Sequence, residues 1–177
     1  MSLKPWKKIS SEIKSKNLWW TYIYDKCELP NGKIHEYHYV HTAGSSFIIP
    51  IKENGKIILV NQYRYLNARF SIEFPGGGIK EGQLPEQVAR KELIEETGFD
   101  GVLEKVGFFN PYNGVTDEIC HVFIARNLKP SDKETKDDSE EFEMLELTSE
   151  EIDKLIQTNE IYDGMTMAAW AIVKSKI

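Results

Sequence analysis

Three successive glycines, Gly76–Gly78, stand a few residues ahead of a helix-forming segment, and this pairing constrains the fold more than any other feature of the sequence. The run Phe70–Phe74 has the pattern of a short strand. A helix is predicted from Pro85, which suits a first helical turn, to Gly98, which suits a helix end. Successive glycines let backbone approach a ligand or a metal ion, so a strand, a close-approach loop and a helix are expected in that order.

The first third of the sequence predicts β-structure. The segments Trp19–Leu29 and His35–Thr42 are rich in aromatic and β-branched residues, and the turn signal Pro30–Gly32 between them predicts a hairpin. Asn54-Gly55 predicts a second hairpin within Ser45–Tyr65. Both hairpins are expected to contribute strands to the fold.

The remaining elements mix strands with helices. Strands are predicted within Val102–Phe109, Ile119–Leu128 and Phe142–Leu147, and helices within Thr148–Gln157 and Gly164–Ile177. A regular βαβ alternation is missing from this order, which favours a mixed sheet flanked by helices over a doubly wound parallel sheet. The predicted class is α+β.

Length and composition set the outer bounds. A chain of 177 residues suffices for one domain with a small appendage. The net charge of -6 argues against affinity for nucleic-acid backbone, and no apolar run reaches the roughly 20 residues of a membrane span. We expect a cytoplasmic protein that binds neither nucleic acid nor membrane. Cys27 and Cys120 lie far apart and outside any metal-binding spacing, so both are expected to be free thiols.

Acidic residues gather on one side of the predicted helix. Glu92, Glu95 and Glu96 fall within roughly 100° of a helical wheel, while Arg90 and Lys91 are expected to point elsewhere. Carboxylates four residues apart repel by ~0.2–0.5 kcal/mol, and a bound hard cation such as Mg²⁺ would turn that repulsion into attraction. A solvated surface face is the alternative interpretation of the same pattern.

The glycine loop and the acidic helix together resemble the signature of the Nudix hydrolases. From Gly77 onwards, seven signature positions fall in register: Gly77, Glu92, Leu93, Glu95, Glu96, Gly98 and Phe99. Two positions depart, because Gln83 replaces a Glu and Lys91 replaces an Arg. In the family those two residues brace the loop and orient the carboxylates, so we expect the two departures to act as a linked pair.

Flanking segments resemble the branch of this family that hydrolyses ADP-ribose and nucleotide sugars. The carrying stretches are LVNQYRY and IEFPGGGIKEG, together with the hairpin from Leu18 to Val40. The resemblance implies a Nudix-type α/β/α sandwich with a mixed sheet at residues 45–177, and a small N-terminal antiparallel β-hairpin domain at residues 1–44. It also implies a homodimer in which one chain's hairpin packs on the other.

Site residues follow from the resemblance position by position. The metal-binding positions are the Gly76 carbonyl and the carboxylates of Glu92, Glu95 and Glu96, with Mg²⁺ as the expected ion and Mn²⁺ as an alternative. The substrate-binding positions are Arg64, Trp20 and Tyr37. Strand packing is the alternative interpretation for the two aromatic residues.

The general base has less support in the sequence. In the branch it lies on a loop before the last strand, which implies Glu140 or Glu141, with Asp138 behind them and Glu95 as a further candidate. The expected activity is Mg²⁺-dependent hydrolysis of ADP-ribose or a related nucleoside diphosphate sugar. Pro111 precedes the position usual for ADP-ribose hydrolases, which leaves other sugars open. A nucleotide sensor with weakened catalysis and a housecleaning nucleoside triphosphatase are the alternatives.

Overall fold

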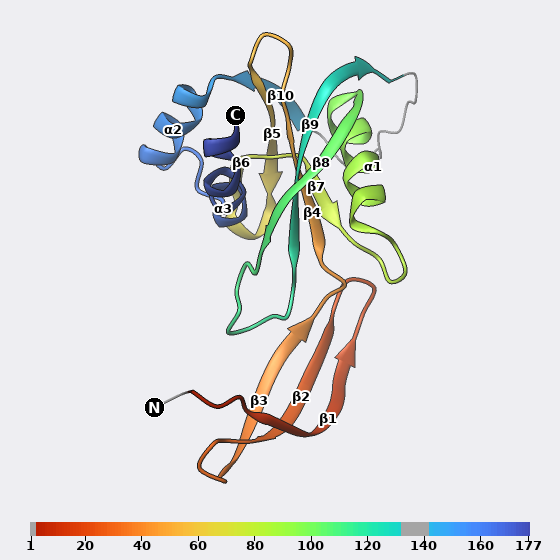
Figure 1. The fold of residues 1–177 in the computed structure, drawn as a ribbon, viewed down its shortest axis with the longest axis vertical. Coiled ribbons are helices and arrows are strands. Elements are labelled where there is room, and N and C mark those ends of the chain that lie inside the picture. The colour runs from red at the N-terminus through yellow and green to blue at the C-terminus, as the bar shows by residue number, and fades with distance from the viewer. Residues whose placement is uncertain (1–2, 132–141) are drawn as a thin grey trace. The chain divides into compact units, whose positions relative to one another are not determined.

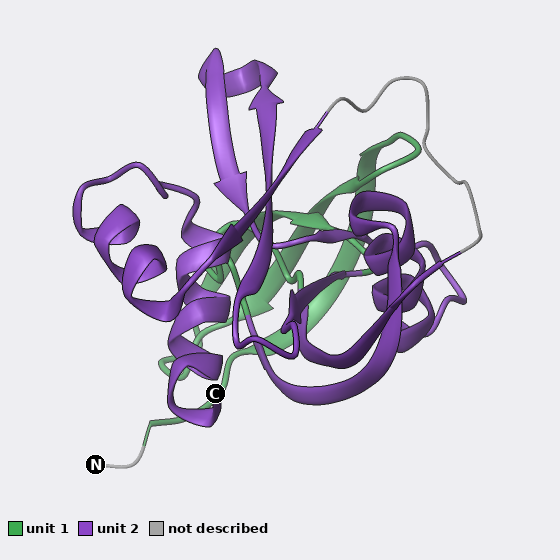
Figure 2. Cartoon of the chain, turned by 90° about the horizontal axis from the view of Figure 1, so that it is seen from above, with its two compact units in different colours: residues 1–43, 110–118 green, residues 44–109, 119–177 purple. Residues whose placement is uncertain are grey.

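The chain forms two compact units, which are described separately. The structure is a computed structural model, and it describes residues 3–131 and 142–177 (Figure 1). Unit 1 comprises residues 1–43 and 110–118, and unit 2 comprises residues 44–109 and 119–177 (Figure 2).

Unit 1 is built on a three-stranded antiparallel sheet in the order β1-β2-β3. Its strands are β1 (Lys7–Lys16), β2 (Thr21–Glu28) and β3 (Ile34–His41). The predicted hairpin is confirmed, because Leu29 N donates to Lys33 O at 2.8 Å across the turn. Strand β1 was not predicted from the sequence, and all ten of its residues are exposed.

A distant segment completes unit 1. Residues 110–118 lie along the end of β3, where Val40 N donates to Val115 O at 2.8 Å. The hydroxyl of Tyr37 donates to Gly114 O at 3.2 Å. This unit is therefore assembled from two parts of the chain that are separated in sequence by residues 44–109.

Unit 2 contains two sheets and the α-helices. The four-stranded mixed sheet has the order β7-β4-β9-β8, with β4 and β9 parallel. The three-stranded antiparallel sheet has the order β10-β5-β6. The strands are β4 (Ser45–Pro50), β5 (Ile57–Arg64), β6 (Arg69–Glu73), β7 (Gly76–Gly78), β8 (Phe99–Phe109), β9 (Cys120–Pro130) and β10 (Phe142–Leu147). The α-helices are α1 (Pro85–Thr97), α2 (Ser149–Gln157) and α3 (Gly164–Val173). Short 3-10 turns occur at Tyr65–Asn67 and Lys174–Lys176.

The second predicted hairpin is wrong. A tight turn does join β4 to β5, where Lys52 N donates to Lys56 O at 2.9 Å. A single isolated bridge, between Ile51 and Ile57, flanks this turn. Beyond it the two strands belong to different sheets. Strand β4 is buried along its whole length and pairs instead with β7 and β9, because packing on both faces outweighs the local preference of an Asn-Gly turn.

Side chains of β4 and β9 alternate between two apolar clusters. Ile48 and Phe123 pack with Ala89 and Leu93 of α1. On the other face, Ile49, Val122 and Ile124 join residues of β5, α2 and α3 in the larger cluster, which includes Trp170. The mixed sheet thus lies between α1 and the C-terminal helices, as the predicted sandwich requires (Figure 1).

The helix ends agree with the sequence signals. Helix α1 begins at Pro85 and ends before Gly98, which has φ 72° and donates its N–H to Ile94 O at 2.9 Å. Helix α2 begins after Thr148, whose hydroxyl accepts from Glu151 N at 3.2 Å. None of the helices in the described residues is both long and apolar enough to cross a bilayer.

Candidate active site

Packing of α1 fixes the direction of its carboxylates. Val88, Ala89 and Leu93 are buried against the mixed sheet. Glu92 lies at the edge of this contact with 14% of its side chain exposed, and Glu95 follows with 22% exposed. The apolar positions of one helix face therefore hold the acidic residues close to the glycine strand β7 rather than in open solvent.

Two of the three carboxylates meet the glycine strand directly. Gly76 N donates to Oε2 of Glu96 at 3.0 Å. A Cβ atom at Gly77 would lie 2.6 Å from both the carboxyl carbon and Oε1 of Glu92. The strand brings backbone to within contact of both side chains, and a residue larger than glycine at position 77 would displace Glu92.

Gly76 is required for a different reason. It pairs with Phe47 of β4, and a Cβ atom on it would lie 2.5 Å from the carbonyl oxygen of Ser46. Gly78 is unconstrained, since a Cβ atom there would meet nothing within 4 Å. Gly76 is thus needed for sheet packing, and Gly77 is needed for the position of the Glu92 carboxylate.

Lys91 does not point away from the acidic residues, and that expectation is wrong. Its ammonium nitrogen is hydrogen-bonded to Oε2 of Glu95 and lies 3.4 Å from Oε1 of Glu92. A helical wheel locates Cα positions, whereas the four-carbon stem of lysine carries the charge well beyond its own position. Burial lowers the pKa of Lys91, but the bond to Glu95 and the charges of both carboxylates outweigh it, so the pKa is raised.

Gln83 has a partner of its own. Its side-chain oxygen accepts from Lys80 N at 2.9 Å and so closes the turn that precedes α1. No hydrogen bond joins Gln83 to Lys91 in the part of the chain that the structure describes. The expected link between these two departures from the family signature is therefore not made by a hydrogen bond between them.

Arg64 and Glu73 form the main ion pair of the β5–β6 hairpin. Arg64 Nε donates to Oε1 of Glu73 at 2.8 Å, and Nη2 donates to Oε2. The Glu73 carboxylate is almost fully buried, with 6% of its side chain exposed, while half of the Arg64 side chain remains exposed. This two-bond geometry fixes the plane of the guanidinium and leaves part of it open to solvent.

The charge of one α1 carboxylate, that of Glu96, acts on Arg64. The hydrogen bond from Arg64 to Glu73 is the main cause of the raised pKa of Arg64, and the charges of Asp163 and Glu96 add to it. Arg64 as a substrate-binding residue stays a prediction, and Glu73 was not singled out from the sequence as its partner. The pair follows from the observed register: Gln62 pairs with Ser71, and strand alternation then puts Arg64 and Glu73 on one face.

The carboxylates of α1 beside β7 fit a small hard cation. Among residues 3–131 and 142–177, no three His, Cys, Asp or Glu side chains are grouped so that they could hold a metal ion. Mg²⁺ often takes only one or two carboxylates and completes its shell with water and substrate phosphates. Glu92 and Glu96 beside the backbone of Gly76 and Gly77 match that requirement.

The other predicted site residues either belong to unit 1 or fall outside the described residues. Trp20 and Tyr37 belong to unit 1, where Trp20 N donates to Oδ1 of Asn17 at 2.8 Å. The Tyr37 ring contacts Trp6 edge to face at a centroid distance of 6.2 Å. Glu140 and Glu141, and Asp138 with them, lie outside the described residues. The proposed base therefore stays a prediction.

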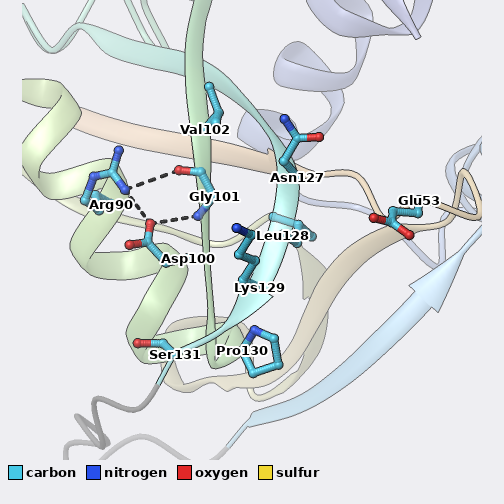
Figure 3. A pocket seen from close by; sticks show the side chains of 10 residues that line it. All are labelled: Glu53, Arg90, Asp100, Gly101, Val102, Asn127, Leu128, Lys129, Pro130 and Ser131. Carbon is cyan, nitrogen blue, oxygen red and sulfur yellow. Dashed lines mark hydrogen bonds and ion pairs between the residues drawn. The ribbon is translucent and has the colours of Figure 1, made fainter.

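A cavity of about 690 Å³ lies beside the start of β8 and the end of β9, with Arg90 of α1 among its lining residues (Figure 3). Arg90 lies along its wall, and the guanidinium bonds to Asp100 and to Gly101 O. The residues that line this cavity are Glu53, Arg90, Asp100, Gly101, Val102, Asn127, Leu128, Lys129, Pro130 and Ser131. Because none of them is a predicted site residue, this hollow is separate from the candidate chemistry.

The family model of the NUDIX domain matches residues 40–167, which include the glycine strand, α1 and the Arg64–Glu73 pair. The chain therefore belongs to the NUDIX family, and its class is that of the Nudix hydrolases.

Particular relatives narrow the comparison. The chain is 38% identical over 144 residues to the ADP-ribose pyrophosphatase of Bacillus subtilis (strain 168), covering 80% of this chain and 78% of that protein. It is 30% identical over 180 residues to the GDP-mannose pyrophosphatase of Yersinia enterocolitica, covering 90% of each. A crystal structure of an ADP compounds hydrolase matches the fold with a TM-score of 0.85 at 20% identity, over 99% of this chain and 95% of that one.

Proposed function

We propose that this Nudix hydrolase cleaves the diphosphate bond of ADP-ribose or a related nucleoside diphosphate sugar in a Mg²⁺-dependent reaction. The products would be a nucleoside monophosphate and a sugar phosphate. The observation that carries the proposal is the half-exposed guanidinium of Arg64, fixed by Glu73 and electrostatically coupled to Glu96. Such an arrangement offers a diphosphate one cationic contact next to a carboxylate pair that can hold metal ions.

Each residue of the site has a separate task in this proposal. Arg64 binds a phosphate oxygen and orients the diphosphate. Glu92 and Glu96 hold the cation, and Gly76 N keeps Glu96 directed at the glycine strand. When bound, the metal would supply charge neutralisation of the phosphate oxygens and help to orient the water.

The hydrolysis itself needs a base. Water attacks one phosphorus atom, the bond from that phosphorus to the bridging oxygen breaks, and the second phosphate leaves with that oxygen. A carboxylate accepts the proton of the attacking water and later releases it to solvent. Glu140 and Glu141 are the proposed bases, with Glu95 as the further candidate, although its bond to Lys91 occupies one of its oxygens.

Unit 1 supplies the other parts of the proposal. Trp20 and Tyr37 are proposed to stack on the nucleobase, and a homodimer is proposed to form through the β2–β3 hairpin. Leu18, Trp19 and Ile34 are large apolar side chains that remain mostly exposed in the single chain. Sedimentation at micromolar concentration should show a dimer, and a monomer would refute this part. We also propose a cytoplasmic location, which rests on the sequence alone.

A substrate screen tests the central proposal. The full-length protein would be incubated with Mg²⁺ and ADP-ribose, GDP-mannose, other nucleoside diphosphate sugars and nucleoside triphosphates, and released phosphomonoester would be measured. Hydrolysis of at least one nucleotide sugar faster than any triphosphate is expected. Activity on triphosphates alone would favour the housecleaning alternative, and no hydrolysis of any compound would overturn the proposal.

A further inference from the structure

Lys91 already gives two site carboxylates a positive partner. Its Nζ is hydrogen-bonded to Oε2 of Glu95 and lies 3.4 Å from Oε1 of Glu92. A lysine ammonium is a compact point charge with three donors, so one group can serve two neighbouring carboxylates. The lysine thus occupies a position where a bound cation would otherwise contact the same oxygens.

Exposure shows how the lysine covers its partners. More than half of the Lys91 side chain is exposed, against 14% for Glu92 and 22% for Glu95. The ammonium therefore approaches from the solvent side and covers carboxylates that are themselves largely enclosed. Its order on the helix, with lysine four residues before the glutamate, is the less favourable one for a helical ion pair. The contact consequently reflects the local concentration of negative charge more than helix spacing.

We propose that Lys91 is a tethered counter-ion that competes with divalent cations for Glu95 and for Oε1 of Glu92. The inference rests on the proposed function, in which Glu92 and Glu96 hold the metal. While Lys91 is in place, Glu95 is withheld from the metal shell. Glu96, the second oxygen of Glu92 and the backbone of β7 remain as the proposed ligands.

The arrangement of the described residues supports this competition. No three acidic, histidine or cysteine side chains within residues 3–131 and 142–177 are grouped to hold a metal ion. The third member that the helix could contribute, Glu95, is bonded to Lys91. A cation that recruits Glu95 must either move the lysine outward or bind beside its charge. Both outcomes weaken binding of a divalent ion, since like charges repel strongly where water is partly excluded.

Direct metal binding tests the inference without relying on activity. Full-length wild-type protein and its variants would be titrated with Mn²⁺, and free Mn²⁺ would be counted by electron paramagnetic resonance. Lys91→Gln is expected to bind one further ion per chain or to bind its weakest ion at least about tenfold more tightly. Lys91→Arg, which keeps the charge, should bind Mn²⁺ like the wild type.

Lys154→Gln is the matched control. Lys154 lies exposed on α2, and its loss changes the net charge by the same amount as Lys91→Gln. Its isotherm should equal that of the wild type. Lys91→Met provides a second uncharged variant that keeps the length of the stem, and circular dichroism would verify the fold of each protein.

The outcomes separate the inference from the proposed function. If the uncharged Lys91 variants bind Mn²⁺ with the stoichiometry and affinity of the wild type, the counter-ion role is refuted, even when the wild type hydrolyses nucleotide sugars. If Lys154→Gln tightens binding as much as Lys91→Gln, the effect is one of net charge, and the inference fails. Absence of nucleotide-sugar hydrolysis by the wild type would refute the proposed function and leave the binding result standing.

Discussion

The buried carboxylate of Glu73 accepts two hydrogen bonds from the guanidinium of Arg64, one of them 2.8 Å long between Nε and Oε1. Glu73 is therefore a positioning residue for Arg64. A Glu73→Gln variant keeps the shape of the side chain and removes its charge, so the guanidinium loses its fixed plane. We expect KM for the nucleotide sugar to rise about 10- to 100-fold, because misplaced binding groups cost up to two orders of magnitude.

Steady-state kinetics would measure this change, with Glu146→Gln as the control. Glu146 forms an ion pair with Lys52 at 2.6 Å on β10, and it has no role in the proposed site. The control should leave both kinetic constants near wild-type values. Equal KM values for Glu73→Gln and the wild type would show that Arg64 needs no such support.

The three glycines of β7 should respond differently to alanine. Gly76→Ala places a methyl group against the Ser46 carbonyl and should lower the free energy of unfolding by about 1–3 kcal/mol. Gly77→Ala meets the carboxyl group of Glu92, a movable side-chain end, and should mainly reduce kcat. Gly78→Ala meets nothing and should be close to neutral.

Chemical denaturation and kinetics on the same three variants would check the series. The order of stability and the order of activity are expected to differ, since only the first substitution clashes with backbone. If Gly77→Ala retains full activity, the position of Glu92 beside the glycine strand has no bearing on turnover.

The carboxylates of α1 give the sharpest test of the proposed metal site. Glu92→Gln or Glu96→Gln should lower kcat by orders of magnitude at ordinary Mg²⁺ while the thermal unfolding midpoint falls little. A glutamine at position 96 can still accept the hydrogen bond from Gly76 N, so the fold is preserved. Near-normal turnover of either variant at saturating Mg²⁺ would remove that residue from the ligand set.

The effects of changing Gln83 and Lys91 should be additive. The two side chains bond to Lys80 N and to the helix carboxylates respectively, and not to each other. In a double-mutant cycle of Gln83→Glu and Lys91→Arg, the interaction energy in kcat/KM should stay within about 0.5 kcal/mol. An interaction energy well above this value would indicate coupling through the glycine loop.

A comparison of two single variants tests the proposed general base. Glu140→Gln or Glu141→Gln, but not both, should cut kcat by about 10²–10⁴ with little change in KM, because a base acts in the transition state. If neither variant loses more than about tenfold, the base lies elsewhere, and Glu95→Gln becomes the next variant to assay.

Local signals predicted the elements well where the local chain decides the structure. Helix α1 begins at Pro85 and ends before Gly98 because both residues act through backbone geometry. The turn before β3 also forms as its sequence indicates. The predicted pairing of β4 with β5 was wrong because the Asn-Gly turn depends only on neighbouring residues, whereas the burial of β4 on both faces depends on strands distant in the sequence. Strand β1 escaped prediction since its lysines and serines carry no apolar alternation.

The site shows the same division. The positions of Glu92, Glu96 and Gly77 could be found from sequence spacing, because one loop and one helix contain them all. The Arg64–Glu73 pair depends on cross-strand register, and the Lys91 contact depends on where a long side chain ends. Neither is encoded in spacing along a single element.

The closing of unit 1 by residues 110–118 has a consequence for how the protein is made. During synthesis, β3 leaves the ribosome before the segment that bonds to Val40 and Tyr37 has been translated. At the usual rates of roughly 5–20 residues per second, the delay is on the order of seconds, far longer than a hairpin needs to form. The nascent N-terminal sheet therefore lacks its hydrogen bonds to residues 110–118 until the β8–β9 connection emerges. A chain truncated before residue 110 cannot form these bonds.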